Sequence, residues 1–241
     1  MDKIILIETS TALCSVALAE GGAITAYRES SAPKAHASLT AVFVQEVLAE
    51  RGVKLADCDA VCVSKGPGSY TGLRVGVSTA KGLCFGAGVP LLAVGTLDTL
   101  VAQAVMVTEQ DVISGTSPVI SSDQYYKYII PMIDARRMEV YSAVFENGGQ
   151  ITETSPVIVD DTSFSEYLEH GPCLFIGDGA GKCADVIKHP NAHFCQCNPM
   201  ASAMLSPAMD ALKAERFEDV AYFEPFYLKE FVATVSKKKL F

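Results

Sequence analysis

The chain has 241 residues, 49% of them hydrophobic, which is enough for one large domain or two small ones with a well-filled core. Its formal net charge of −9 argues against a protein that grips a nucleic-acid backbone by itself. No apolar run approaches the ~18 residues that a membrane span needs, and the start MDKIILIET lacks the pattern of a signal peptide. We therefore expect a cytoplasmic protein without contact to a membrane.

Apolar runs divided by glycine and proline turns predict alternating strands and helices over the first hundred residues. Strands are expected at 4–7, 15–19, 23–28, 60–63 and 90–94, and helices at 36–51 and 70–85. The last strand, helix and strand would form a parallel β-α-β unit. Apolar residues cover more than one side of the helix at 36–51, which is typical of a helix that is buried on two sides.

The helix expected at 70–85 carries two rows of small residues at a spacing of four. The rows are Gly72, Gly76 and Ala80, and Ser78, Gly82 and Gly86. A glycine inside a helix costs about 1 kcal/mol relative to alanine, so the bare backbone must allow a close contact. That contact is either with the chain's own sheet or with a partner protein, and the spacing does not say which row faces inward. We predict a partner interface on both helices, formed by Leu39, Phe43, Gly72, Gly76, Val77, Ser78 and Ala80.

The second half of the chain repeats the pattern of the first. The stretch IILIETSTALCSVALAEGGAIT aligns with IPMIDARRMEVYSAVFENGGQIT, so that Glu8 corresponds to Asp134 and the Gly-Gly turns coincide. This duplication predicts two related lobes that face one another. We place the first lobe, which carries the dimerisation helices, at 1–100, and a smaller second lobe with a C-terminal tail at 101–241.

The remaining elements follow from the same signals. Helices are expected at 163–169, 181–187 and 199–215, and strands at 174–176 and around Phe194. Asn198 would cap the last helix, with Pro199 at its first position. The polar stretch at 105–124 is interpreted as a linker or mobile loop.

Two α/β units whose first strands each end in an acid resemble the actin/Hsp70/sugar-kinase (ASKHA, ribonuclease H-like) architecture, in which each lobe is a mixed β-sheet flanked by helices. In that superfamily ATP lies between the lobes and the first turn of each lobe holds phosphate. The turns at 9–11 and 135–137 occupy those places here, and the turn at 177–180 resembles the adenosine-binding turn. The resemblance implies Thr9, Ser10, Gly177 and Gly179 as candidate nucleotide contacts.

Catalytic residues are harder to assign. Glu8 and Asp134 would hold Mg²⁺ if the lobes closed on ATP, but we favour the interpretation that they are remnants of an ancestral fold. The chain has no phosphate-binding loop of the Gly-x-x-x-x-Gly-Lys-[Ser/Thr] type and no His-Glu-x-x-His motif. We therefore predict no catalytic centre of its own.

A group of histidines and cysteines late in the chain has side chains that suit zinc. The group comprises His189, His193, Cys195 and Cys197. It lacks a Cys-x-x-Cys pair, and its sequence is also typical of a plain strand. We therefore expect no metal site.

Several motifs together resemble the TsaB (YeaZ) family. They are GPGSYTGLRVGVSTAKGL, PLLAVGTLD, IETSTALCSVAL, IDARRMEVYSA, IGDGAGK and PFYLKE. The resemblance implies a non-catalytic subunit that pairs with a TsaD-type catalytic subunit, together with a TsaE-type ATPase, in forming threonylcarbamoyladenosine beside the tRNA anticodon. It further implies a homodimer in isolation, tRNA contact only through the complex, and no tight cofactor, with ATP or ADP expected only at a composite site. The alternatives are an independent actin-like ATPase or kinase, and a glycopeptidase.

Overall fold

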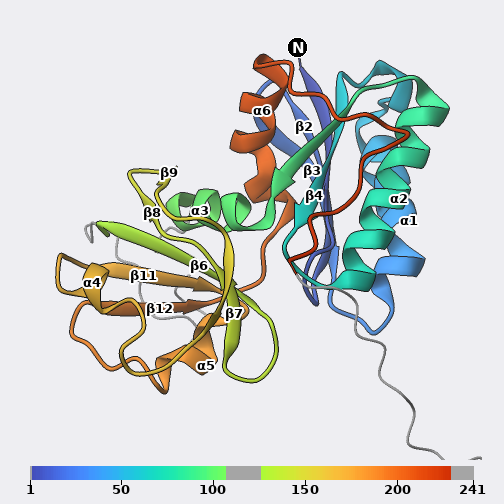
Figure 1. Ribbon diagram of the computed structural model, residues 1–241. Coiled ribbons are helices and arrows are strands. Elements are labelled where there is room, and N and C mark those ends of the chain that lie inside the picture. The colour runs from blue at the N-terminus through green and yellow to red at the C-terminus, as the bar shows by residue number, and fades with distance from the viewer. Residues whose placement is uncertain (1, 107–125, 229–241) are drawn as a thin grey trace, which may run out of the picture.

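The computed structural model describes residues 2–106 and 126–228, which form two lobes (Figure 1). In the first lobe a five-stranded sheet has the order β3-β2-β1-β4-β5. Its elements are β1 (Lys3–Glu8), β2 (Cys14–Glu20), β3 (Ala23–Ser30), α1 (Ala35–Arg51), β4 (Ala60–Gly66), α2 (Tyr70–Ala87) and β5 (Leu91–Gly95). This is the predicted order of the first hundred residues, and β4 and β5 are parallel as expected.

The second lobe repeats this plan around a seven-stranded sheet with the main order β10-β7-β6-β11-β12. Its elements are β6 (Tyr128–Asp134), β7 (Glu139–Ser142), β8 (Phe145–Glu146), β9 (Gly149–Gln150), β10 (Ser155–Ile158), α4 (Ser165–Leu168), β11 (Cys173–Gly177), α5 (Ala180–Ala184) and β12 (Ala192–Gln196). As in the first lobe, an antiparallel hairpin is followed by parallel strands. This shared topology, in which β1 ends at Glu8 and β6 ends at Asp134, confirms the predicted duplication and the ribonuclease H-like fold class.

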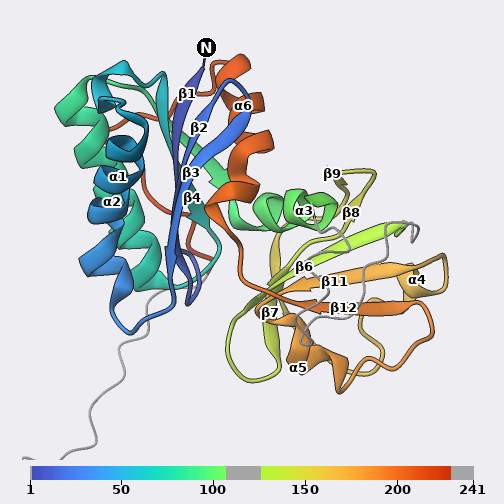
Figure 2. The ribbon, with the colours of Figure 1, turned by 180° about the vertical axis from the view of Figure 1, so that it is seen from behind.

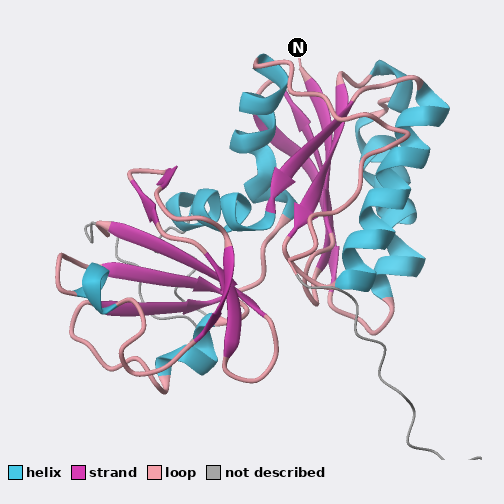
Figure 3. Ribbon diagram, in the orientation of Figure 1, coloured by secondary structure: helices cyan, strands magenta, loops and turns pink. Residues whose placement is uncertain are grey.

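Helices cover both faces of the first sheet (Figures 1 and 3). On one face, α1 and α2 pack over a core that includes Ile5, Val16 and Val63. On the other face lies the last helix, α6 (Leu205–Lys213), whose Ala208 packs with Ile4 and other inward side chains of the sheet. Burial of these apolar side chains is the main force that holds the helices to the sheet.

The placement of α6 corrects the expected division of the chain, because part of the span 101–241 belongs to the core of the first lobe. The predicted helix at 199–215 is also shorter, and a 3₁₀ turn at Ala201–Met204 precedes it. Pro207 explains the late start, since proline is tolerated in the first turn of a helix and not beyond it. Asn198 does not cap this helix, and its carbonyl oxygen accepts a hydrogen bond from Gln103 instead.

A helix that the sequence analysis did not assign joins the lobes. This is α3 (Thr96–Met106), whose Leu97 and Leu100 pack on the second sheet. Within it, the buried Gln103 donates from Nε2 to the carbonyl of Asn198 at 3.0 Å and accepts from the amide of Met200 at 3.1 Å. The predicted linker at 105–124 lies almost entirely outside the described residues. The two hydrogen bonds of Gln103 thus attach α3, which leads from the first lobe to the second, to the segment that leads back.

Among the described residues, none of the helices is long and apolar enough to cross a membrane.

Candidate functional site

The inner row of α2, which we define as Gly72, Gly76 and Ala80, faces the chain's own sheet. A Cβ atom at Gly76 would lie 2.1 Å from Thr9 Oγ1, and one at Gly72 would lie 2.1 Å from the Thr9 carbonyl oxygen. Both distances are far below contact, so only glycine lets the helix approach the end of β1 this closely. The inner row is therefore explained by packing within the lobe.

Most of the residues predicted to form the partner interface are buried between the helices and the sheet of their own lobe. Gly72, Gly76, Ala80, Phe43 and Val77 are buried in the single chain. Leu39 is half-buried against the core, and only Ser78 is exposed. The buried residues do not form a surface that a partner could contact, so an interface on these helices must use other side chains.

The outer helix face, which we define as Val42, Ser78, Gly82, Phe85 and Gly86, is the exposed side of α1 and α2. Phe85 is 86% exposed and Val42 is 40% exposed. Cβ atoms at Gly82 and Gly86 would meet nothing within 4 Å. The two helices lie side by side along one face of the first sheet (Figure 2). An aromatic side chain beside bare helix backbone is typical of a protein contact surface.

The first candidate phosphate turn is covered by the loop that precedes α2. Thr9, Ser10 and Thr11 are 0%, 1% and 5% exposed. The amide of Ser69 donates to the Ser10 carbonyl oxygen at 2.6 Å, and a Cβ at Gly68 would lie 2.4 Å from that same oxygen. The predicted nucleotide contacts Thr9 and Ser10 are therefore shielded from solvent in this chain.

Glu8 lies at the bottom of the same turn and is fully buried. The amide of Ser10 donates to Glu8 Oε1 at 2.7 Å, whereas Glu8 Oε2 has no hydrogen-bond partner among the described residues. Burial raises the pKa of the Glu8 carboxyl to about 7, because a charged group is poorly solvated there. The full burial of Glu8 keeps its carboxyl away from solvent and from a hydrated Mg²⁺.

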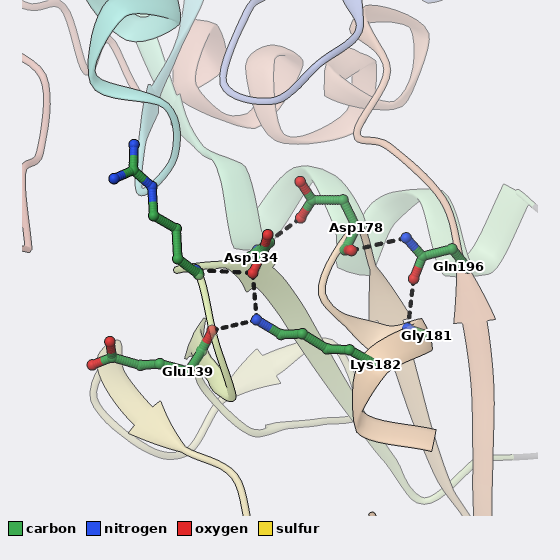
Figure 4. A network of polar contacts seen from close by, with 7 residues as sticks. Asp134, Glu139, Asp178, Gly181, Lys182 and Gln196 are labelled. Carbon is green, nitrogen blue, oxygen red and sulfur yellow. Dashed lines mark hydrogen bonds and ion pairs between the residues drawn. The ribbon is translucent and has the colours of Figure 1, made fainter. Parts of the chain in front are cut away.

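The matching acid of the second lobe, Asp134, sits in a polar network (Figure 4). Its carboxylate forms an ion pair with Lys182 and accepts from the amide of Arg136 at 2.9 Å. The amide of Asp134 donates to Asp178 Oδ1 at 2.8 Å. The ammonium of Lys182 also donates to the Glu139 carbonyl oxygen at 2.7 Å. Lys182 therefore neutralises the acid that a metal ion would need.

The remaining members of the network hold the turn after β11 in place. Gln196 donates from Nε2 to the Asp178 carbonyl oxygen at 2.8 Å and accepts from the amide of Gly181 at 2.5 Å. Burial raises the pKa of the Asp178 carboxyl to about 6. The sequence analysis missed Lys182 and Gln196, because their partners are 48 and 18 residues away along the chain.

The glycines of the predicted adenosine-binding turn have a packing role. A Cβ at Gly177 would lie 2.2 Å from the Met132 carbonyl oxygen, and Gly177 has a φ of +134°. A Cβ at Gly179 would lie 2.9 Å from a methyl group of Val140, and its amide donates to the Met132 carbonyl oxygen at 3.0 Å. The close approach to β6 and β7 accounts for both glycines without a ligand.

Part of the histidine and cysteine group forms a strand, as its pattern indicated, whereas His189 and Cys197 lie outside that strand. His193 and Cys195 lie on β12, where Cys195 is buried and the His193 ring contacts Tyr126 edge-on with 5.2 Å between centroids. Within the residues that the structure describes, no group of three or more histidine, cysteine, aspartate or glutamate side chains could hold a metal ion.

Comparison of this chain with known proteins shows which class of protein it belongs to. The model of the TsaD family, described as tRNA N6-adenosine threonylcarbamoyltransferase, matches residues 29–221. Fold and match together define a two-lobed, ribonuclease H-like protein related to the threonylcarbamoyltransferases. The threonylcarbamoyltransferase of Maricaulis maris is 43% identical over 67 residues, which is 28% of this chain and 18% of that protein.

Other relatives match over nearly the whole length. The tRNA threonylcarbamoyladenosine biosynthesis protein TsaB of Escherichia coli is 30% identical over 239 residues, covering 96% of both chains. A solved structure of YeaZ from Pseudomonas aeruginosa superposes with a TM-score of 0.76 at 27% identity, over 95% of this chain and 100% of that one. The chain belongs to the TsaB (YeaZ) family, whose members take part in the threonylcarbamoyladenosine modification of tRNA.

Proposed function

We propose that this chain is a non-catalytic dimerisation and scaffold subunit, and that it pairs with a TsaD-type subunit that transfers threonylcarbamoyl to the tRNA adenosine next to the anticodon. The observation that carries the proposal is the outer helix face, where Phe85 is 86% exposed beside Gly82 and Gly86. Such an arrangement suits contact with a second helix pair. The local 43% identity to a threonylcarbamoyltransferase supports a partner with a related fold.

The two acids support the non-catalytic part of the proposal. Glu8 is buried and has a raised pKa, and Asp134 is paired with Lys182. The Glu8 carboxylate is shut off from solvent, and the exposed Asp134 carboxylate already has Lys182 as its counter-charge, whereas Mg²⁺ prefers oxygen ligands that leave part of its water shell in place. An independent ATPase or kinase would need both acids, and a glycopeptidase would need metal ligands.

The proposal extends to the other members of the assembly. The chain would form a homodimer through the outer helix face when alone, and exchange this contact for the TsaD-type partner. A TsaE-type ATPase would join the pair, tRNA would be reached through the complex, and ATP or ADP would bind at a composite site. The chain would work in the cytoplasm without a tightly bound cofactor and without membrane contact.

The test is reconstitution of tRNA modification from this chain, the TsaD-type subunit and the TsaE-type ATPase. We expect modification to require this chain, ATP hydrolysis to be absent from the chain alone, and Glu8→Gln and Asp134→Asn to modify tRNA at nearly the wild-type rate. About a 100-fold loss of modification, about 2.7 kcal/mol, with unchanged melting and pairing would contradict the scaffold role. Mass measurement of the mixture gives the stoichiometry.

A further inference from the structure

The C-terminal strap, which we define as residues 216–228, crosses the first lobe after α6 (Figure 1). It has no regular secondary structure, yet several hydrogen bonds hold it. The amide of Glu218 donates to the Leu91 carbonyl oxygen at 2.8 Å, and that of Phe226 donates to the Lys65 carbonyl oxygen at 2.7 Å. Lys81 donates to two further strap carbonyls, at 3.1 and 2.9 Å. The strap is therefore positioned before any ligand arrives, which lowers the cost of binding.

A groove of about 920 Å³ lies between the strap, the turn after β4, the junction of β5 and α3, and the segment from β9 to β10 in the second lobe. This volume is within the range of ligand sites in proteins. Carboxylates from several parts of the chain line it, namely Asp98, Glu153, Glu218, Asp219 and Glu224. Among the described lining residues, Lys65 is the one basic side chain. The groove therefore attracts cations.

Aromatic side chains add a second feature that is independent of the charge. Tyr222 and Phe226 line the groove and are 84% and 44% exposed. Phe217 and Tyr227 of the same strap are 46% and 37% exposed. Large aromatic side chains at the surface of a monomer are typical of protein contact sites, where they act as anchors.

We propose that this acidic, aromatic groove binds an arginine-bearing segment of a partner protein. Aromatic faces and carboxylates together match the guanidinium group, which stacks on rings and pairs with carboxylates through two parallel hydrogen bonds. A metal ion would not use the aromatic side chains. The aromatic residues that line the groove are spread from Tyr222 to Phe226 along the strap, which suits an extended peptide better than a small amine. The proposal does not rest on the scaffold function.

The probe is an eight-residue peptide of alternating arginine and glycine, titrated calorimetrically into the full chain at physiological salt. We expect one peptide per chain. The double variant Glu153→Gln/Glu224→Gln should weaken binding roughly three- to tenfold, because it removes two exposed charge pairs with the peptide. Asp161→Asn/Glu169→Gln is the matched control, because it removes the same charge from exposed positions near α4 and should leave binding unchanged. Tyr222→Ala should weaken binding with an unchanged melting temperature.

Four outcomes would overturn the proposal. Equal losses in the control pair would show attraction by net charge alone. Equal binding of a lysine–glycine peptide would remove the role of the aromatic side chains. Equal binding of spermidine would indicate a small-molecule site. Tighter peptide binding in Lys237→Ser/Lys238→Ser/Lys239→Ser than in Lys34→Ser/Lys54→Ser/Lys213→Ser, which removes the same charge elsewhere, would identify the chain's own C-terminal residues as the occupant.

Discussion

The inner row of α2 and its outer row, Ser78, Gly82 and Gly86, both consist of small residues at a spacing of four but have different surroundings. At Gly76 an added Cβ would meet Thr9 at 2.1 Å, whereas at Gly82 it would meet nothing within 4 Å. The inner glycines are thus required by the fold of the single chain. The outer glycines have no such requirement, and their helix cost of about 1 kcal/mol each is offset only if another molecule packs there.

The largest expected effect separates the two rows directly. Gly76→Leu should destabilise or unfold the chain by about 3 kcal/mol or more, because the new side chain would occupy the space of Thr9. Ser78→Leu, on the exposed side of the same helix, should keep the wild-type melting temperature. Thermal melts of both variants are the measurement, and two equal melts would show that the rows do not differ.

The second prediction concerns the acid beneath the inner row. The pKa of Glu8 is raised from 4.5 to about 7, so the folded chain binds its proton more tightly than the unfolded chain does. The stabilisation from this proton is complete below about pH 4.5 and is lost as the pH rises through about 7, a change on the order of 3 kcal/mol.

Glu8→Gln should remove this dependence, because the amide is neutral at every pH and its oxygen can still accept from the Ser10 amide. Melts at pH 5 and pH 8 should diverge between wild type and variant, with the variant relatively more stable at pH 8. The exposed Glu169→Gln is the control. Parallel curves for wild type and Glu8→Gln would mean that the buried carboxyl does not titrate in this range.

The third prediction tests the outer helix face. Phe85→Ser should weaken both self-association and capture of the TsaD-type subunit roughly ten- to hundredfold, about 1–3 kcal/mol, because Phe85 is 86% exposed and would be a central anchor. The melting temperature of the monomer should not change. Ile158→Ser, which removes another exposed hydrophobic side chain away from α1, α2 and the strap, should leave association intact. Light scattering and a partner pull-down decide the matter, and an unaffected Phe85→Ser variant would place the interface elsewhere.

The smallest expected effect is a change in stability whose sign differs between the two rows of α2. Gly82→Ala should stabilise the isolated chain by about 0.5–1 kcal/mol, since alanine is the better helix former and the site has open space. Gly76→Ala should destabilise it, because even a methyl group would clash with Thr9. Denaturant titration measures both. Two shifts in the same direction would show that helix propensity outweighs the contact with Thr9.

The sequence predicted the seven elements of the first lobe because their periodicity is local. It did not distinguish the rows of α2, since the distinction depends on Thr9, which comes from a different strand. The pair of Lys182 with Asp134 was missed for the same reason. The α3 helix was missed because it follows β5 without an intervening turn. The return of α6 to the first sheet required knowledge of the whole topology.

The side chain of Gln103 has a thermodynamic consequence. Its two part-buried hydrogen bonds to Asn198 and Met200, and the buried bond from the amide of Ala201 to Ser15 Oγ at 2.9 Å, hold the segment that returns from the second lobe to the first. Opening the lobes would leave these groups unsatisfied, at about 1–3 kcal/mol each. If the chain joins a partner with these contacts intact, the heat-capacity change of association should equal that of the buried contact surface alone.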